Sequence, residues 1–234
     1  MGTGRVAIPL IESGVELIGL DLSPAMLRRY RTKAGARRTP GVCADLVALP
    51  FREASFAAVL GVHVFHLVGR WRDGLAEVKR VLAPGGRLLH SWHRASHGSL
   101  EPEIREALGE IARRHGASVE RPGARDAAEV VRALADRGAG TRTVEIASWT
   151  SSTTPRTLLH QLRAGLFTYT WSMEPRIAAA CVDELERWAT RRYRSLDAVE
   201  RFRETFELHV HDFRDVERSL FSGAEGRLAD ARAS

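Results

Sequence analysis

The stretch that decides the fold is GVELIGLDLSPAMLRRYRTK, residues 14–33. It opens with a turn at Gly14 and continues as a short apolar run, which predicts a buried strand ending near Leu22. Ser23 and Pro24 then have the signature of a helix start, because serine caps the first turn and proline suits the first helical position. We therefore expect a strand followed directly by a helix over Ala25–Lys33.

The same alternation continues downstream. Two more short strands are predicted at Gly41–Asp45 and Ala57–Val62, and a helix begins near Arg72. Pro84-Gly85-Gly86 stops that helix, and Arg87–Trp92 is expected to be a fourth strand. Short buried strands that alternate with helices favour a parallel sheet covered on both faces. The predicted fold class is α/β, with an open, mostly parallel sheet of the Rossmann-like type.

Beyond residue 99 the pattern shifts toward amphipathic helices. Helical faces are expected at Ile104–Ile111, Val131–Leu134, Leu158–Leu162 and Ile177–Trp188, and strands at Thr141–Trp149 and Glu204–Phe213. The small and charged residues 222–234 are expected to form a disordered tail.

Composition indicates an ordinary globular protein. The 234 residues fit one domain, with 44% hydrophobic and 27% charged residues. No apolar run reaches the roughly 18 residues of a membrane span, and no signal peptide is apparent, so we expect a cytoplasmic protein. Cys43 and Cys181 are expected to be reduced and packed. The sequence indicates no oligomeric state.

The positive charge raises the question of nucleic acid. The formal charge is +6, yet lysine occurs only at Lys33 and Lys79, and the arginines are mixed with acids as on solvated helix faces. No Asn/Asp-Pro-Pro-aromatic string follows the third strand, as an enzyme that acts on a flipped-out base would need. Nucleic acid is therefore not the expected partner.

Three local features carry chemistry. Gly2-Thr3-Gly4 runs into an apolar helix, so backbone N–H groups there are able to approach a ligand. Asp21 ends the next strand, where an acid accepts both hydroxyls of a ribose; it could equally cap the following helix. Asp45, with Leu46 beside it, ends the second strand; its carboxylate suits an adenine amino group, or it is a turn residue.

Taken in order and spacing, these features resemble the type 11 family of class I S-adenosylmethionine-dependent methyltransferases. The resemblance covers about residues 2–95 and rests on the segments DLSPAML (21–27), ADL…LPF (44–51), HVFHL (63–67) and the Pro-Gly-Gly turn. It implies S-adenosylmethionine as cofactor, a small-molecule acceptor, residues 1–98 as the cofactor-binding half, and residues 99–221 as a helical cap with closing strands. The implied cofactor contacts are Gly2, Gly4, Asp21, Leu22, Met26, Asp45, Leu46 and Val62.

Each implied contact has its own role. Gly2 and Gly4 would approach the methionine end of the cofactor, Asp21 would hold the ribose, and Leu22 and Met26 would flank the adenine. Asp45 and Leu46 would contact the adenine, and Val62 would lie beside the methionine through its backbone.

The sequence departs from the family pattern in two places. A central strand ending in an acid and a glycine normally precedes the position of Gly2, whereas here Met1 stands directly before it. We expect a start placed too far downstream, or else a truncated chain, since two strands would otherwise keep unpaired backbone groups. Ala57 also stands where the family often has an aspartate.

Histidines are the candidates for proton transfer to or from the acceptor. They follow the third and fourth strands, where open α/β sheets place ligands: His63 and His66 first, then His93 and His97. Each could equally be a wall residue of a loop. A metal site is not expected, because no paired cysteines accompany His90, His93 and His97, and because His209 and His211 are typical of a solvated edge face. Aromatic residues that could line a substrate pocket, or form the core of the cap, are Trp149, Tyr169 and Trp171.

The sequence thus predicts methyl transfer to a small molecule. A non-enzymatic remnant of such an enzyme is the main alternative. A nicotinamide-dependent oxidoreductase also uses glycines followed by an acid, but it needs no adenine-reading acid at Asp45.

Overall fold

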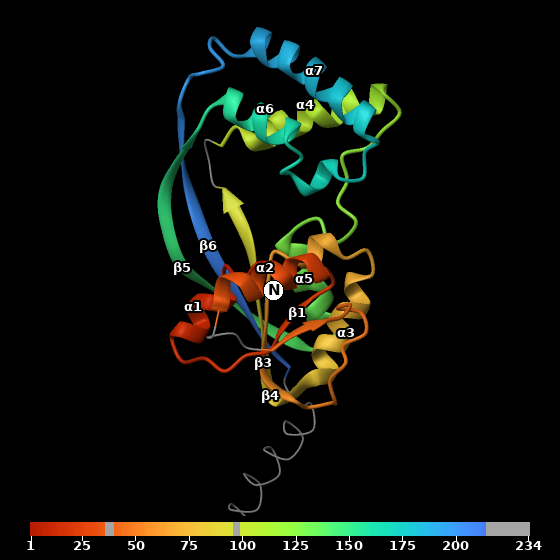
Figure 1. The fold of residues 1–234 in the computed structure, drawn as a ribbon, viewed down its shortest axis with the longest axis vertical. Coiled ribbons are helices and arrows are strands. Elements are labelled where there is room, and N and C mark those ends of the chain that lie inside the picture. Colours follow the sequence, from red (N-terminus) through yellow and green to blue (C-terminus); the bar gives the residue numbers. More distant parts are fainter. Residues whose placement is uncertain (36–39, 96–98, 214–234) are drawn as a thin grey trace, which may run out of the picture.

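The computed structural model describes residues 1–35, 40–95 and 99–213, apart from the side chains of residues 93–95. The expected tail at 222–234 therefore lies outside the described residues. Figure 1 shows a lower part that contains the strands β1–β4 and an upper part made of helices, joined by the long strands β5 and β6.

The first sheet contains two parallel strands. β1 (Gly19–Asp21) pairs with β2 (Gly41–Cys43), with Asp21 opposite Cys43. Between them runs α2 (Pro24–Ala34), in which the Ser23 side chain accepts a hydrogen bond from the Met26 amide, as the sequence predicts. A short helix, α1 (Ala7–Glu12), precedes β1.

The second sheet has the order β3-β4-β6-β5. β3 (Phe56–Val62) and β4 (Leu82–Ala95) are parallel and are connected by α3 (Trp71–Val81). β6 (Glu200–Phe213) runs antiparallel to both β4 and β5 (Ala139–Thr153). The α/β class, with parallel pairing of β1 with β2 and of β3 with β4, confirms the predicted fold class. Helix α3 ends at Val81, before the predicted stop at Pro84, because Leu82 already pairs with Phe56 of β3.

The two sheets are not joined by backbone pairing. Among the described residues, no strand pairs with both β1 and β3. Two residues predicted to be buried in the first strand are consequently accessible: Ile18 is 45% exposed and Leu22 is 67% exposed. Leu60 of β3 is also 43% exposed, although its strand is apolar throughout. The prediction of a buried first strand was therefore wrong for Ile18 and Leu22, because β1 has one strand neighbour here instead of two.

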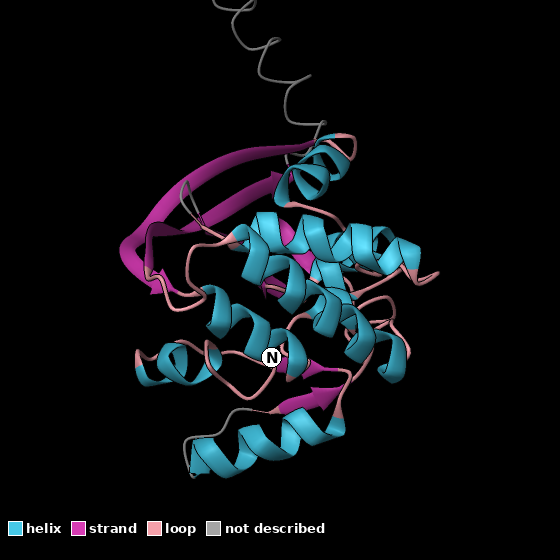
Figure 2. Ribbon diagram, turned by 90° about the horizontal axis from the view of Figure 1, so that it is seen from above, coloured by secondary structure: helices cyan, strands magenta, loops and turns pink. Residues whose placement is uncertain are grey.

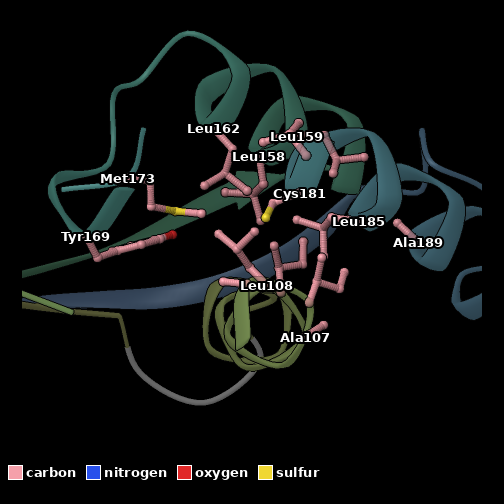
Figure 3. Packing of buried hydrophobic residues seen from close by; sticks show 14 residues of the cluster. Ala107, Leu108, Leu158, Leu159, Leu162, Tyr169, Met173, Cys181, Leu185 and Ala189 are labelled. Carbon is pink, nitrogen blue, oxygen red and sulfur yellow. The ribbon is translucent and has the colours of Figure 1, made fainter. Parts of the chain in front are cut away.

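The upper part is a cap of three helices. α4 (Glu101–Arg114), α6 (Pro155–Arg163) and α7 (Pro175–Arg192) enclose an apolar cluster together with the short helix η3 (Thr168–Thr170). Figure 3 shows the leucines of α4, α6 and α7 meeting around Cys181. The periodicity read from the sequence predicts these buried faces, which are built from Ile104, Leu108, Leu158, Leu162, Cys181 and Leu185.

A second cluster forms the core of the lower part. Helix α5 (Ala127–Ala135) packs there with α3 and β4, although it lies in the chain between two cap elements. Figure 2 shows the helices gathered beside the curved strands. The cluster includes Phe65, Trp71, Leu75, Val78, Leu88, Val130 and Leu134. Within the described ranges, no helix is both long and apolar enough to cross a membrane.

Candidate functional site

Asp21 lies at the carboxyl end of β1 and organises the glycine turn. Its Oδ2 accepts a hydrogen bond of 2.6 Å from the Gly2 amide and one of 3.3 Å from the terminal ammonium of Met1. Its Oδ1 accepts a bond of 2.9 Å from the Ser23 amide. A carboxylate offers about four acceptor positions, so these three donors leave room for a further hydroxyl. The Asp21 carboxylate thus braces the entry to α2, and its contact with a ribose remains a prediction.

The charge of Asp21 is maintained by these contacts. Burial by itself would raise the pKa of this carboxyl, but the amides of Ser23 and Gly2 and the nearby terminal ammonium lower the pKa below its ordinary value. These contacts therefore favour the ionised form of Asp21.

The glycine turn requires glycine at two positions. Gly2 and Gly4 have φ angles of 59° and 86°, in the left-handed region that side chains disfavour. A Cβ on Gly4 would also stand 2.7 Å from the ring of Tyr30. The backbone at this turn therefore packs directly against α2, next to the carboxylate of Asp21.

The residues expected around an adenine divide into two groups. Leu22 and Met26 are 67% and 36% exposed, so both present apolar surface beside Asp21. Asp45 follows β2, and the Ala44 amide donates to the Asp21 carbonyl, which brings the two acids to the same end of the parallel pair. The Leu46 side chain packs against Gly74 of α3, where a Cβ would lie 2.9 Å from it. A contact between Leu46 and an adenine remains a prediction.

The other predicted residues follow β3, in the second sheet. Val62 ends this strand, and the next residue, His63, has a φ of 52° while its amide donates to the Ser91 carbonyl of β4. A non-glycine residue in this region is strained, and such strain is found preferentially at functional sites. The turn leads into the short helix η2 (Phe65–Leu67), which carries His66.

His66 is an unusual buried histidine. It is 8% exposed, lies 5.2 Å from the Trp92 ring, and its Nδ1 has no hydrogen-bond partner among the described residues. Burial first, then the charges of Arg121 and His63, lower its pKa to about 4. The ring is therefore neutral at physiological pH and weakly basic.

Three further histidines, His90, His209 and His211, form a network that the sequence did not predict. His90 and His211 are fully buried, with 2.8 Å between His90 Nδ1 and His211 Nε2, and His90 stacks on His209 at 4.6 Å. The expectation of a solvated edge face for His209 and His211 was wrong, because β6 lies between β4 and β5. Among the described residues, no group of three potential ligands could hold a metal ion. The His93 side chain and His97 lie outside the described residues.

The three aromatic candidates do not share one pocket wall. Tyr169 is 2% exposed in the cap cluster, whereas Trp149 and Trp171 are 42% and 63% exposed. Both cysteines are free thiols; Cys181 is buried, as predicted, and Cys43 is exposed.

One candidate functional residue, Arg121, was not indicated by any motif in the sequence. Arg121 lies in the connection between α4 and α5, and its Nε is buried without a hydrogen-bond partner in the described part of the chain. A single arginine in a chain rich in arginine carries no distinguishing spacing, so only the packing around it reveals the position.

The first part of the chain matches a known family. Residues 1–90 match the family described as a methyltransferase domain, which confirms the resemblance read from the segments around Asp21 and Asp45. A demethylmenaquinone methyltransferase of Thermus thermophilus is 42% identical over 92 residues. That alignment covers 38% of this chain and 42% of the relative, so the chain spans less than half of that relative's length.

Solved structures extend the likeness to the whole fold. A proposed methyltransferase of Bacillus halodurans superposes with a TM-score of 0.58 at 17% identity, covering 92% of this chain and 90% of its own. The cyclase SpnF superposes with a TM-score of 0.52 at 18% identity, covering 91% of this chain and 71% of its own. At such identities the superpositions show a shared Rossmann-like α/β fold.

Proposed function

We propose that this protein transfers a methyl group from S-adenosylmethionine to a small-molecule acceptor. The observation that carries the proposal is the position of two acids, Asp21 and Asp45, at the carboxyl ends of the adjacent parallel strands β1 and β2. They lie within the segment that matches the methyltransferase domain. Ligands of open α/β sheets bind at this end of the strands.

The residues present fit the cofactor. Asp21 retains acceptor capacity for a ribose hydroxyl, and the glycine turn stands directly beside it. Leu22 and Met26 offer accessible apolar surface on which an adenine ring could lie. An ionised acid next to uncovered apolar side chains suits a nucleoside, which combines hydroxyls with a flat ring.

The cofactor, when bound, supplies a methyl carbon on a sulfonium, which the nucleophilic atom of the acceptor takes while the bonding electron pair stays on sulfur. The protein has to align the acceptor and, where the acceptor carries a proton, receive that proton. His63 and His66 follow the strand that ends at Val62 and are the proposed acceptor-facing pair, with 6.4 Å between their rings. Because the pKa of His66 is about 4, its ring is a poor general base near neutrality and is better suited to hydrogen bonding. We therefore assign proton removal to His63 in preference to His66.

The identity of the methyl acceptor is not inferred from the names of the relatives. The family match ends at residue 90, whereas the cap helices begin at Glu101. Since the cap lies outside the matched segment, methylation of demethylmenaquinone is one candidate reaction among small-molecule methylations.

Calorimetric titration with S-adenosylhomocysteine tests the proposal. Wild-type protein is expected to bind it, and Asp21→Asn to bind it about tenfold or more weakly, because hydrogen bonds to a charged acceptor contribute roughly 1.5–3 kcal/mol. Asp73→Asn is the matched control, since Asp73 is 52% exposed and pairs only with Arg70 among the described residues. Absence of binding by folded wild-type protein, or equal binding by Asp21→Asn, would refute the proposed function.

A further inference from the structure

Three buried polar atoms lie without partners around the junction of the cap and the lower part of the molecule. They are His66 Nδ1, Arg121 Nε and the Tyr169 hydroxyl, and none has a hydrogen-bond partner among the described residues. His66 is 8% exposed and Tyr169 is 2% exposed. A buried donor left unsatisfied costs roughly 1–3 kcal/mol, so three of them in one region indicate partners supplied from outside the chain.

Backbone contacts hold Arg121 close to His66. The amides of Gly123 and Ala124 donate to the carbonyls of His66 and Phe65, at 3.2 and 3.0 Å. A Cβ on Gly123 would lie 2.0 Å from the Phe65 carbonyl oxygen, so only glycine permits this approach. The segment that carries Arg121 is therefore fastened to the loop at the carboxyl end of β3.

Arg121 also contacts the cap. Its guanidinium carbon lies 5.9 Å from the centre of the Tyr169 ring. Tyr169 belongs to the cap cluster, and Figure 3 shows it beside Met173 at the margin of that cluster. Arg121 thus stands between the proposed acceptor-facing histidines and the cap.

The electrostatic setting is that of an incomplete ion pair. Burial lowers the pKa of Arg121, the charge of Arg105 lowers it further, and Glu101 raises it. The guanidinium nevertheless stays protonated, as arginine does in proteins. No ion pair of Arg121 is formed within the described residues, and its Nε has no hydrogen-bond partner there. A partly buried guanidinium that lacks an ion pair is stabilised when an anion binds to it.

We propose that Arg121 binds a carboxylate group of the methyl acceptor, with the Tyr169 hydroxyl and the His66 ring as neutral hydrogen-bonding partners. A carboxylate fits better than a phosphate, because it carries a single charge and its planar shape matches the paired N–H groups of one guanidinium. This inference rests on the proposed function and specifies its substrate as a carboxylic acid.

Fluorine NMR with para-fluorobenzoate on the full chain tests the inference, and para-fluorobenzamide is the uncharged probe of the same shape. We expect line broadening of the benzoate with wild-type protein and binding of the benzamide weaker by about tenfold or more. Arg121→Gln should weaken benzoate binding by a similar factor, whereas Arg125→Gln, a change at an 82% exposed arginine, should leave it unchanged. Tyr169→Phe should weaken it by about threefold or more through loss of one hydroxyl.

The possible results distinguish failure of this inference from failure of the proposed function. Equal binding of the two probes, no broadening with wild-type protein, or benzoate binding unaffected by both Arg121→Gln and Tyr169→Phe would overturn the inference. Circular dichroism measures whether each variant is folded. If either Arg121→Gln or Tyr169→Phe fails to fold, the other variant still tests the inference. Binding of S-adenosylhomocysteine without binding of the benzoate refutes this inference alone, whereas the reverse result refutes the proposed cofactor and leaves the carboxylate site standing.

Discussion

Acidification should destabilise this protein through its buried histidines, and His90→Gln should relieve part of that loss. His90 and His211 are fully buried, and their surroundings are neutral or cationic: His209 on β6, Thr141 and Thr143 on β5, and the ring of Phe65. Within the described part of the chain, the acid that favours the charged form of His211 is Asp212, and its effect is smaller than that of burial. Burial, followed by neighbouring histidines, lowers the pKa of His90 to about 3 and that of His211 to about 4.

The sign follows from proton binding. Below an ordinary histidine pKa of about 6.5, the unfolded chain takes up a proton on each of these residues while the folded protein does not. The unfolded state then binds more protons, so stability falls as the pH decreases from about 6.5 toward the folded pKa values near 3 and 4. Each pH unit corresponds to about 1.4 kcal/mol per histidine, which amounts to about 2 kcal/mol for each residue between about pH 7 and pH 5. Two histidines together remove about 4 kcal/mol from a typical total of about 5–15 kcal/mol.

Urea unfolding followed by circular dichroism measures this difference. Between about pH 7 and pH 5, the free energy of unfolding of His90→Gln should fall by about 2 kcal/mol less than that of the wild type. His160→Gln, which changes an exposed histidine of α6, should behave like the wild type. A loss in His90→Gln as large as in the wild type would show that His90 is not kept neutral by the fold.

Three further changes test the packing that surrounds the proposed sites. Gly123→Ala should destabilise the protein by several kcal/mol, on the order of 3, because its methyl group would collide with the Phe65 carbonyl oxygen; thermal unfolding measures the effect, and an unchanged melting temperature would contradict it. Leu185→Ala, in the cap core, should cost about 2–5 kcal/mol in urea unfolding, whereas the exposed Leu166→Ala should cost little. Thr154→Ala removes the cap of α6 and should cost about 1 kcal/mol in the same assay, with Thr154→Ser retaining most of the stability.

The helices and the succession of strands along the chain followed from the sequence itself. Ser23-Pro24 and Thr154-Pro155 predicted two helix starts, because capping is decided by residues within one turn of each other. The buried face of α7 was readable for a similar reason, since its apolar residues recur at the helical period. The acids at the ends of β1 and β2 were likewise visible, because a parallel strand presents its last residues at one edge of the sheet.

Other features depended on the tertiary structure alone. Exposure of Ile18 and Leu22 results from the number of strands beside β1, and the burial of His209 and His211 results from the position of β6 inside its sheet. Local periodicity predicts neither this exposure nor this burial. An alternation of apolar and polar residues shows which side chains share a face, but not which elements cover that face. The same holds for Arg121, whose Nε is buried without a hydrogen-bond partner among the described residues, in a connection that Gly123 allows to lie against the loop after β3. Local order is encoded by neighbours in the chain, whereas burial and charge pairing are decided by residues that meet only in the folded protein.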